Sequence, residues 1–201
     1  MRLWVVALLA AAAWAAGVER AAAIYLTEKG PVAHLQGGFE DGDEKIFEAF
    51  LKKPRAGKIK VLYLYSYGGT ISSAAKIAEM VRKAGIATAV RAADDVCDSA
   101  CTLVFAGGVR RYYIGGDSVM EGNSSRTGLG YHPARKIVNV AEGSHLSEGG
   151  SSRLSEIYAK MGCPGASDLM RRAAINTVFR PSGATALKLR IATSLADPGE
   201  R

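Results

Sequence analysis

The chain has 201 residues, a formal net charge of +7 and 48% hydrophobic residues. This length is enough for one domain with a substantial core and too small for two comfortable ones, so one domain is expected. The basic residues are spread along the chain, in pairs at most and without interleaved aromatic residues, so the sequence predicts no nucleic-acid-binding face.

Residues 1–23 have the pattern of a secretory signal peptide. Met1 and Arg2 precede an apolar run that continues to Ala16. A Gly-Val-Glu-Arg segment at 17–20 interrupts the apolar residues, whereas a spanning helix needs about 20 of them. We therefore expect cleavage near residues 16–23, a periplasmic or secreted protein without a membrane span, and a single domain over residues 24–201. An uncleaved membrane anchor is the alternative.

The first half of the mature chain alternates predicted strands and helices. The 60–65 segment is apolar throughout, as is typical of a strand covered on both faces of a parallel sheet. The expected elements are a strand at Val32–Gln36, a helix over residues 43–53, a strand over residues 60–65, a helix at Ile71–Lys83 and a strand at Ala87–Arg91. Strand, helix and strand in this order form a βαβ unit, so the predicted fold class is α/β.

The helix over residues 43–53 is expected to be amphipathic. Ile46, Phe47, Phe50 and Leu51 would share its apolar face, and Pro54 would end it.

The second half is predicted to be more helical. The segment Ala100–Gly107 is apolar all round, which is typical of a short buried helix. The expected elements are a turn over 94–99, this helix, a loop over 121–127, a strand end at 130–132, a mobile Ser/Gly-rich segment over 143–152, and helices over 154–161, 166–174 and 184–190.

Two of the three cysteines lie four residues apart, in Cys97-Asp98-Ser99-Ala100-Cys101. One helical turn places such α-carbons about 6 Å apart, within the range that a disulfide bridges. A bridge would brace the turn that carries Ser99, and Cys163 would be left over. The alternative is a pair of small buried hydrophobic residues. No Cys or His lies at ligand spacing, so we expect neither a metal site nor a cofactor.

A serine and a histidine suggest acyl-transfer chemistry. Ser99 lies at the predicted start of a helix, and His132 follows a later strand, where it would act as the base that activates the hydroxyl. Gly68 and Gly69 lie at a strand-to-helix turn, where they and the Ala100 N–H would stabilise an oxyanion. The alternatives are a helix-capping serine and an ordinary strand-end histidine.

Three segments in this order resemble the ClpP/crotonase superfamily. They are residues 66–74 (Ser-Tyr-Gly-Gly-Thr-Ile-Ser-Ser-Ala), residues 97–101 and residues 129–132 (Leu-Gly-Tyr-His). More narrowly, the chain is similar to exported bacterial proteins related to the Clp protease proteolytic subunit, over about residues 32–194. Tyr67 replaces the proline, and Ala74 the glycine, that are usual in that family.

The resemblance implies a twisted sheet wrapped by helices and a peptide or acyl substrate. It also implies Ser99 as nucleophile, His132 as general base, and Gly68, Gly69 and Ala100 near the oxyanion hole. Family members commonly assemble, so the resemblance further implies a homo-oligomer.

One departure concerns the third catalytic residue, which is usually an aspartate in the family. The segment 174–182 holds no acid, and Asn176 is its nearest match. An asparagine can orient a histidine, but the change from Asp to Asn lowers activity about 10⁴-fold in trypsin-like enzymes. Asp168 is a second candidate, although it lies early in the chain and on a predicted helix.

The sequence therefore favours a periplasmic serine hydrolase, in particular a peptidase. The main alternative is a catalytically degraded family member that acts as a binding or assembly module. Acyl-CoA chemistry, known in crotonases, fits an exported protein poorly because CoA is cytoplasmic. A thiol-redox role fits poorly because the cysteines are not in a Cys-x-x-Cys motif.

Overall fold

The computed structural model describes residues 23–122, 125–139, 143–174 and 176–199. The predicted signal segment therefore lies almost wholly outside the described residues. Over the described ranges, no helix has both the length and the apolar character needed to cross a membrane.

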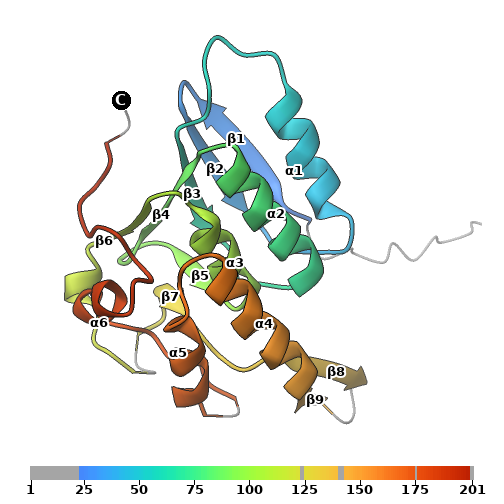
Figure 1. Ribbon diagram of the computed structural model, residues 1–201, viewed down its shortest axis with the longest axis vertical. Coiled ribbons are helices and arrows are strands. Elements are labelled where there is room, and N and C mark those ends of the chain that lie inside the picture. Colours follow the sequence, from blue (N-terminus) through green and yellow to red (C-terminus); the bar gives the residue numbers. More distant parts are fainter. Residues whose placement is uncertain (1–22, 123–124, 140–142, 175, 200–201) are drawn as a thin grey trace, which may run out of the picture.

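A five-stranded sheet runs through the upper part of the molecule (Figure 1), in the order β1-β2-β3-β4-β6. Its strands are β1 (Tyr25–Lys29), β2 (Val32–Gln36), β3 (Val61–Tyr65), β4 (Ala87–Arg91) and β6 (Arg111–Ile114). Strand β1 is antiparallel to β2, and all other neighbours are parallel. The predicted α/β class with βαβ units is confirmed.

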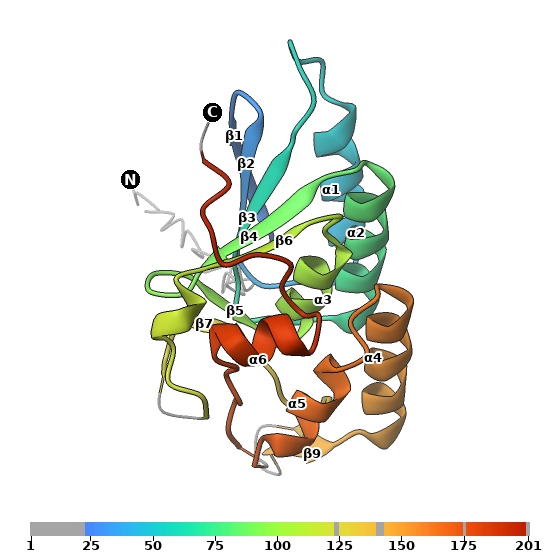
Figure 2. The same cartoon turned by 60° about the vertical axis from the view of Figure 1, so that its left-hand side comes forward.

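Helices cover one face of this sheet, and the end of the chain runs along the other (Figure 2). The covering helices are α1 (Asp43–Lys52), α2 (Ile71–Lys83) and α3 (Ala100–Gly107). On the opposite face, the Tyr63 hydroxyl donates to a carboxylate oxygen of Asp197 at 3.2 Å. Further helices follow late in the chain, namely α4 (Glu148–Lys160), α5 (Ala166–Arg172) and α6 (Gly183–Lys188), and a 3-10 turn (Gly116–Ser118) follows β6.

Strand β3 is buried on both faces, as its apolar sequence predicts. Leu62 and Leu64 belong to the main core under the helices. Val61 and Tyr63 belong to a smaller cluster on the opposite face. Helix α1 differs from the prediction at Ile46, which is 44% exposed, because the helix packs on the sheet through a narrow face that includes Phe47 and Phe50.

Two short strands extend the fold beyond β3, where the sequence indicated only a turn and a strand end. Strand β5 (Val96–Asp98) lies parallel to β7 (Gly128–Gly130). An isolated bridge between Ser66 and Cys97 joins β5 to the end of β3. Pairing between residues distant in the sequence therefore forms a strand within the predicted 94–99 turn.

The Ser/Gly-rich segment 143–152, expected from its composition to be mobile, contains regular secondary structure. A hairpin of β8 (Arg135–Asn139) and β9 (Gly143–Leu146) occupies its start. The Ser147 hydroxyl then accepts a hydrogen bond from the Gly150 N–H at 3.1 Å, which caps α4. A helix cap therefore explains part of the serine content that suggested mobility.

Candidate active site

Ser99 occupies an unusual backbone conformation between β5 and α3. Its φ is 55° and its ψ is −124°, and residues with a Cβ rarely adopt a positive φ. Although Ser99 lies at the N-cap position of α3, its side chain accepts no capping hydrogen bond. The alternative that this side chain serves as a helix cap is therefore wrong. In the described part of the chain, the Ser99 hydroxyl has no hydrogen-bond partner.

Several bonds hold this turn in place. The Ser99 N–H donates to the Gly130 carbonyl at 2.9 Å, and the Ser99 carbonyl accepts from the Thr102 N–H at 3.0 Å. A disulfide joins Cys97 to Cys101, whose α-carbons lie 5.1 Å apart. Because the bridge joins residues on either side of Ser99, it closes a short covalent ring that contains this serine. Both cysteines are buried. Cys163 is a free, buried thiol.

Replacing both Cys97 and Cys101 by alanine is expected to lower the free energy of unfolding by about 2 kcal/mol, the loop-entropy value for so short a ring. Urea denaturation of the two proteins would measure the change. Cys163→Ala is the matched control, because it removes a buried sulfur without opening a ring. A double variant no less stable than this control would show that the bridge does not stabilise the fold.

The glycine turn after β3 packs directly against Ser99. A Cβ on Gly68, whose φ is +100°, would lie 2.7 Å from the Ser99 Cβ and 2.8 Å from the Asp98 carbonyl oxygen. The Gly68 N–H donates to the Ser66 hydroxyl at 3.1 Å. The lack of a side chain at Gly68 therefore allows the glycine turn to lie directly against Ser99. The Gly68 N–H is already bonded to Ser66 and is not free to bind an oxyanion.

Gly69 and Ala100 carry the available donors. The Ala100 N–H lies in the first turn of α3, where amides have no partner within the helix. Over the described residues, neither this N–H nor that of Gly69 forms a hydrogen bond. Two of the three predicted oxyanion residues thus offer a free amide.

His132 follows β7, just as Ser99 follows β5. Asp98 pairs with Gly130 in the parallel register, so both strands end at the same edge. The His132 Nδ1 lies 2.7 Å from the Pro133 carbonyl oxygen. Because a carbonyl only accepts, Nδ1 is assigned the proton, and Nε2 keeps the lone pair that a general base needs. Within the part of the chain described here, no hydrogen bond joins Ser99 to His132.

The surroundings of His132 favour the neutral form of its imidazole. Burial lowers the pKa of His132 below its ordinary value of 6.5, and the positive charge of Arg135 lowers this pKa further. The Pro133 carbonyl and the Asp98 carboxylate partly oppose these effects. A neutral imidazole at pH 7 is the form that accepts a proton from a serine.

Over the described residues, neither of the predicted third residues forms a hydrogen bond with His132. Asn176 lies in an exposed turn, and among the described residues no hydrogen bond links it to the ring. Asp168 is exposed on α5 and pairs with Arg171. The Pro133 carbonyl occupies the position on Nδ1 instead.

A buried ion pair behind Ser99 was not anticipated from the sequence. Arg180 donates to the two carboxylate oxygens of Asp98 at 2.6 and 3.0 Å. Its other N–H groups donate to the carbonyls of Ser125, Arg126 and Gly128. Burial raises the pKa of Asp98, and the hydrogen bonds and charge of Arg180 oppose this rise.

The ion pair links the two halves of the site. Asp98 immediately precedes Ser99, and Phe179, next to Arg180, pairs through its backbone with Tyr131, next to His132. The sequence features that could have indicated this ion pair were an aspartate beside the serine and an arginine before Pro181. They lie 82 residues apart, so no local pattern connects them.

Comparison with known proteins agrees with this architecture. One similar solved structure is the "1510-N membrane-bound stomatin-specific protease" in a serine-to-alanine mutant form, 11% identical, with a TM-score of 0.55 over 84% of this chain and 80% of that one. The chain has the ClpP/crotonase fold. The resemblance inferred from the three sequence segments is confirmed at the level of this fold.

A second similar structure is DspI from Pseudomonas aeruginosa, 11% identical, with a TM-score of 0.49 over 92% of this chain and 72% of that one. No family model and no curated protein matches the chain. The ClpP/crotonase fold thus rests on structural similarity. Within the described ranges, no group of three or more His, Cys, Asp or Glu residues is placed to hold a metal ion.

Proposed function

We propose that this protein is a serine hydrolase that cleaves peptide bonds. The Ser99 oxygen attacks the substrate carbonyl carbon while His132 Nε2 takes the hydroxyl proton. The N–H groups of Gly69 and Ala100 donate to the oxygen that becomes negatively charged. His132 returns the proton to the leaving amine as the C–N bond breaks, and water then releases the acyl group from Ser99 by the reverse proton path.

The backbone of Ser99 is the observation that carries this proposal. A serine that merely starts a helix has an extended backbone and uses its hydroxyl as a cap. Ser99 instead has a positive φ and an unused hydroxyl, and it lies against a glycine turn with no space for a Cβ. Strained residues of this kind persist where the surrounding structure imposes them, and they concentrate at active sites.

Over the described residues, no acidic side chain forms a hydrogen bond with His132, as the aspartate of a Ser-His-Asp triad does. This difference affects the expected rate of hydrolysis more than the reaction steps. The Pro133 carbonyl fixes the tautomer of His132 but carries no full charge to stabilise the imidazolium. The Asp98 carboxylate favours the protonated ring, while Arg180 occupies both of its oxygens. We therefore expect slower turnover than in enzymes with a Ser-His-Asp triad.

A serine-reactive fluorophosphonate probe tests the proposal. The parent protein should be labelled on Ser99, as located by mass spectrometry of the peptide, and Ser99→Ala should not be labelled. Ser72→Ala, on α2, is a control that should react like the parent. No labelling of the folded parent protein would overturn the proposal.

The rate of labelling should depend on pH through His132. Protonated imidazole cannot accept the Ser99 proton, so the rate falls as pH falls through the pKa of His132. Because that pKa lies below 6.5, the midpoint of this decline should also lie below pH 6.5, and the rate should be close to its maximum at pH 8. A midpoint at or above 6.5, measured from pseudo-first-order labelling rates, would contradict this. Arg135→Gln should move the midpoint to higher pH, because Arg135 helps to lower the pKa.

A second candidate function is a binding or assembly module with a degraded site. It is favoured by the absence, over the described residues, of a hydrogen bond between Ser99 and His132. On this account, neither the parent nor Ser99→Ala would react with the probe.

We also propose that the protein is exported. The signal-peptide pattern of residues 1–23 supports export, and a disulfide beside the nucleophile suits an oxidising compartment. Cell fractionation, with the mass of the mature chain, tests this. Recovery of the full-length chain from the cytoplasm alone would overturn it.

A further inference from the structure

The amino ends of the parallel strands form one continuous edge of the molecule. The Lys60 N–H donates to the Pro31 carbonyl at 2.7 Å, and the Ala87 N–H donates to the Lys60 carbonyl at 2.9 Å. The Val109 N–H donates to the Ile86 carbonyl at 3.0 Å. The turns that precede β2, β3, β4 and β6 therefore lie side by side, with the β1–β2 turn and the loop before β3 in the upper part of Figure 1.

This edge carries a concentration of positive charge. Its exposed basic residues, called here the basic edge, are Lys29, Lys53, Lys58, Lys60, Lys83 and Arg110. Within the described part of the chain, none of them forms an ion pair with an acidic residue. The acid nearest to them in the sequence, Glu28, is paired with Arg55 at 2.7 Å.

Local helix chemistry explains only part of this charge. Lys53 and Lys83 lie at the ends of α1 and α2, where cations interact favourably with the helix dipole. Lys58 and Lys60 belong to the loop before β3, and Lys29 and Arg110 flank other turns, so the dipole accounts for none of these four. Unpaired like charges repel one another, and an anionic partner would relieve this repulsion.

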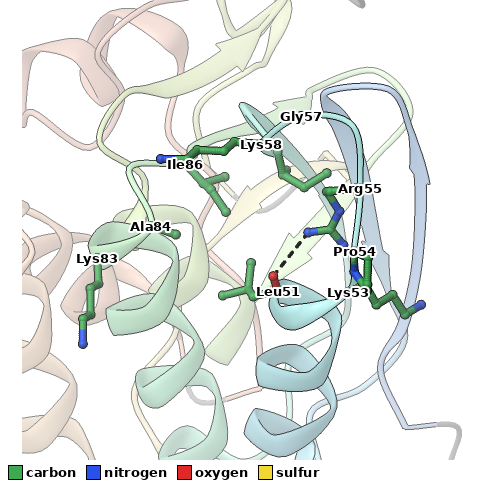
Figure 3. A pocket seen from close by; sticks show the side chains of 10 residues that line it. Leu51, Lys53, Pro54, Arg55, Gly57, Lys58, Lys83, Ala84 and Ile86 are labelled. Atoms are coloured by element: carbon green, nitrogen blue, oxygen red, sulfur yellow. Dashed lines mark hydrogen bonds between the residues drawn. The ribbon is translucent and has the colours of Figure 1, made fainter.

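A shallow cavity lies within the basic edge, between the ends of α1 and α2 (Figure 3), with a volume of about 620 Å³. Apolar residues contribute much of its lining, namely Leu51, Pro54, Ile59, Ala84 and Ile86. Lys53, Lys58 and Lys83 lie around it. The terminal nitrogen of the Arg55 guanidinium is already bound to the Phe50 carbonyl at 2.6 Å and to Glu28, and the unpartnered Nε is buried, so the exposed lysines are the groups open to a ligand.

These features point to a surface partner. Flexible lysines are strongly hydrated point charges, and they lack the fixed fork with which arginine binds a single phosphate. Their spread over several turns, around an apolar hollow and beside the 44% exposed side chain of Val109, matches a layer of anionic headgroups above an apolar interior. The aromatic rings next to the basic edge already carry its own cations, Phe50 under Lys53 and Tyr112 under Arg110, so they are not open platforms on which nucleic-acid bases could stack.

We propose that the basic edge docks on an anionic phospholipid bilayer. The candidate active site lies at the opposite ends of parallel strands, since Ser99 and His132 follow the carboxyl ends of β5 and β7. Docking in this orientation turns the site away from the bilayer and toward solvent.

The test is co-sedimentation of the full chain with vesicles of phosphatidylcholine alone or with 30% phosphatidylglycerol, at low salt. Binding to the neutral phosphatidylcholine vesicles gives the contribution that does not depend on anionic headgroups, including that of the N-terminal residues. The triple variant Lys53→Glu, Lys58→Glu, Lys83→Glu is compared with the control Lys45→Glu, Arg153→Glu, Lys188→Glu. The control residues are also exposed and, over the described residues, unpaired, so net charge changes equally in both variants.

We expect the parent and the control to prefer the anionic vesicles, and 0.5 M salt to abolish this preference. The basic-edge variant should bind them at least about 100-fold more weakly, because each lysine near such a surface contributes about 1 kcal/mol. Equal losses in the two variants, or a parent without preference for anionic vesicles, would overturn the proposal. So would binding to duplex DNA as tight as to the vesicles, or competition by millimolar inorganic phosphate at constant ionic strength. Probe labelling of Ser99 is independent of these measurements.

Discussion

Replacement of Arg180 by methionine is expected to lower the free energy of unfolding by about 3–5 kcal/mol, the range for breaking one side of a buried ion pair. Arg180 and Asp98 are only 4% and 7% exposed. Without the guanidinium, the carboxylate is left buried and unpaired, and the carbonyls of Ser125, Arg126 and Gly128 lose a donor. Urea denaturation at pH 8 measures the change.

Two comparisons isolate the cause. Arg171→Met breaks an exposed pair with Asp168 and should change stability by less than about 1 kcal/mol. The loss in Arg180→Met should also be smaller at pH 5 than at pH 8. Burial already raises the pKa of Asp98, and removing Arg180 removes the group that opposes the rise, so the variant neutralises Asp98 by binding a proton as pH falls. A loss equal to that of Arg171→Met would show that the pair is not structurally important.

Gly68→Ala is expected to lower the rate of Ser99 labelling at least about 100-fold, comparable to the loss of an oxyanion donor. The new Cβ would meet the Ser99 Cβ at 2.7 Å, the Asp98 carbonyl oxygen at 2.8 Å and the Ala100 nitrogen at 3.2 Å. Relieving these contacts must displace the nucleophile, an oxyanion donor or both.

The matched control for this variant is Gly42→Ala. Gly42 has a φ of +97°, close to the +100° of Gly68, but a Cβ there would have no atom within 4 Å. Both variants share the backbone strain, and only Gly68→Ala adds the clash at the site. The control should therefore lose some stability and keep the parent labelling rate, and equal labelling of all three proteins would contradict the assigned packing role of Gly68.

Most elements of the fold were predictable because their signals are local. The spacing of apolar residues, together with a proline and a glycine at helix ends, is sufficient to predict α1, α2 and β3. Strands β5 and β7 were not predictable as a pair, since each has only three residues and exists through contact with the other. Serine content misled the interpretation of residues 143–152, because a capping serine has the same composition signal as a loop.

The residues of the candidate site also fall into those with a local sequence signal and those without one. Ser99, His132 and the glycine turn each lie at a strand end, which a sequence pattern can locate. The partner of His132 Nδ1 is a backbone carbonyl, and any residue type supplies one, so the search for a third side chain pointed to Asn176 instead. Arg180 was missed because its role depends on a contact across 82 residues.

The crowding around Asp98 and Arg180 has a consequence for sequence evolution. A Cβ on Gly130 would lie 2.0 Å from an Asp98 carboxylate oxygen and 2.7 Å from an Arg180 nitrogen. Lysine, with three donors on one atom, could not replace the five hydrogen bonds of the guanidinium. Aspartate, glycine and arginine at these three positions should therefore be inherited or lost together, and their joint presence offers a signature for finding distant homologues with the same arrangement.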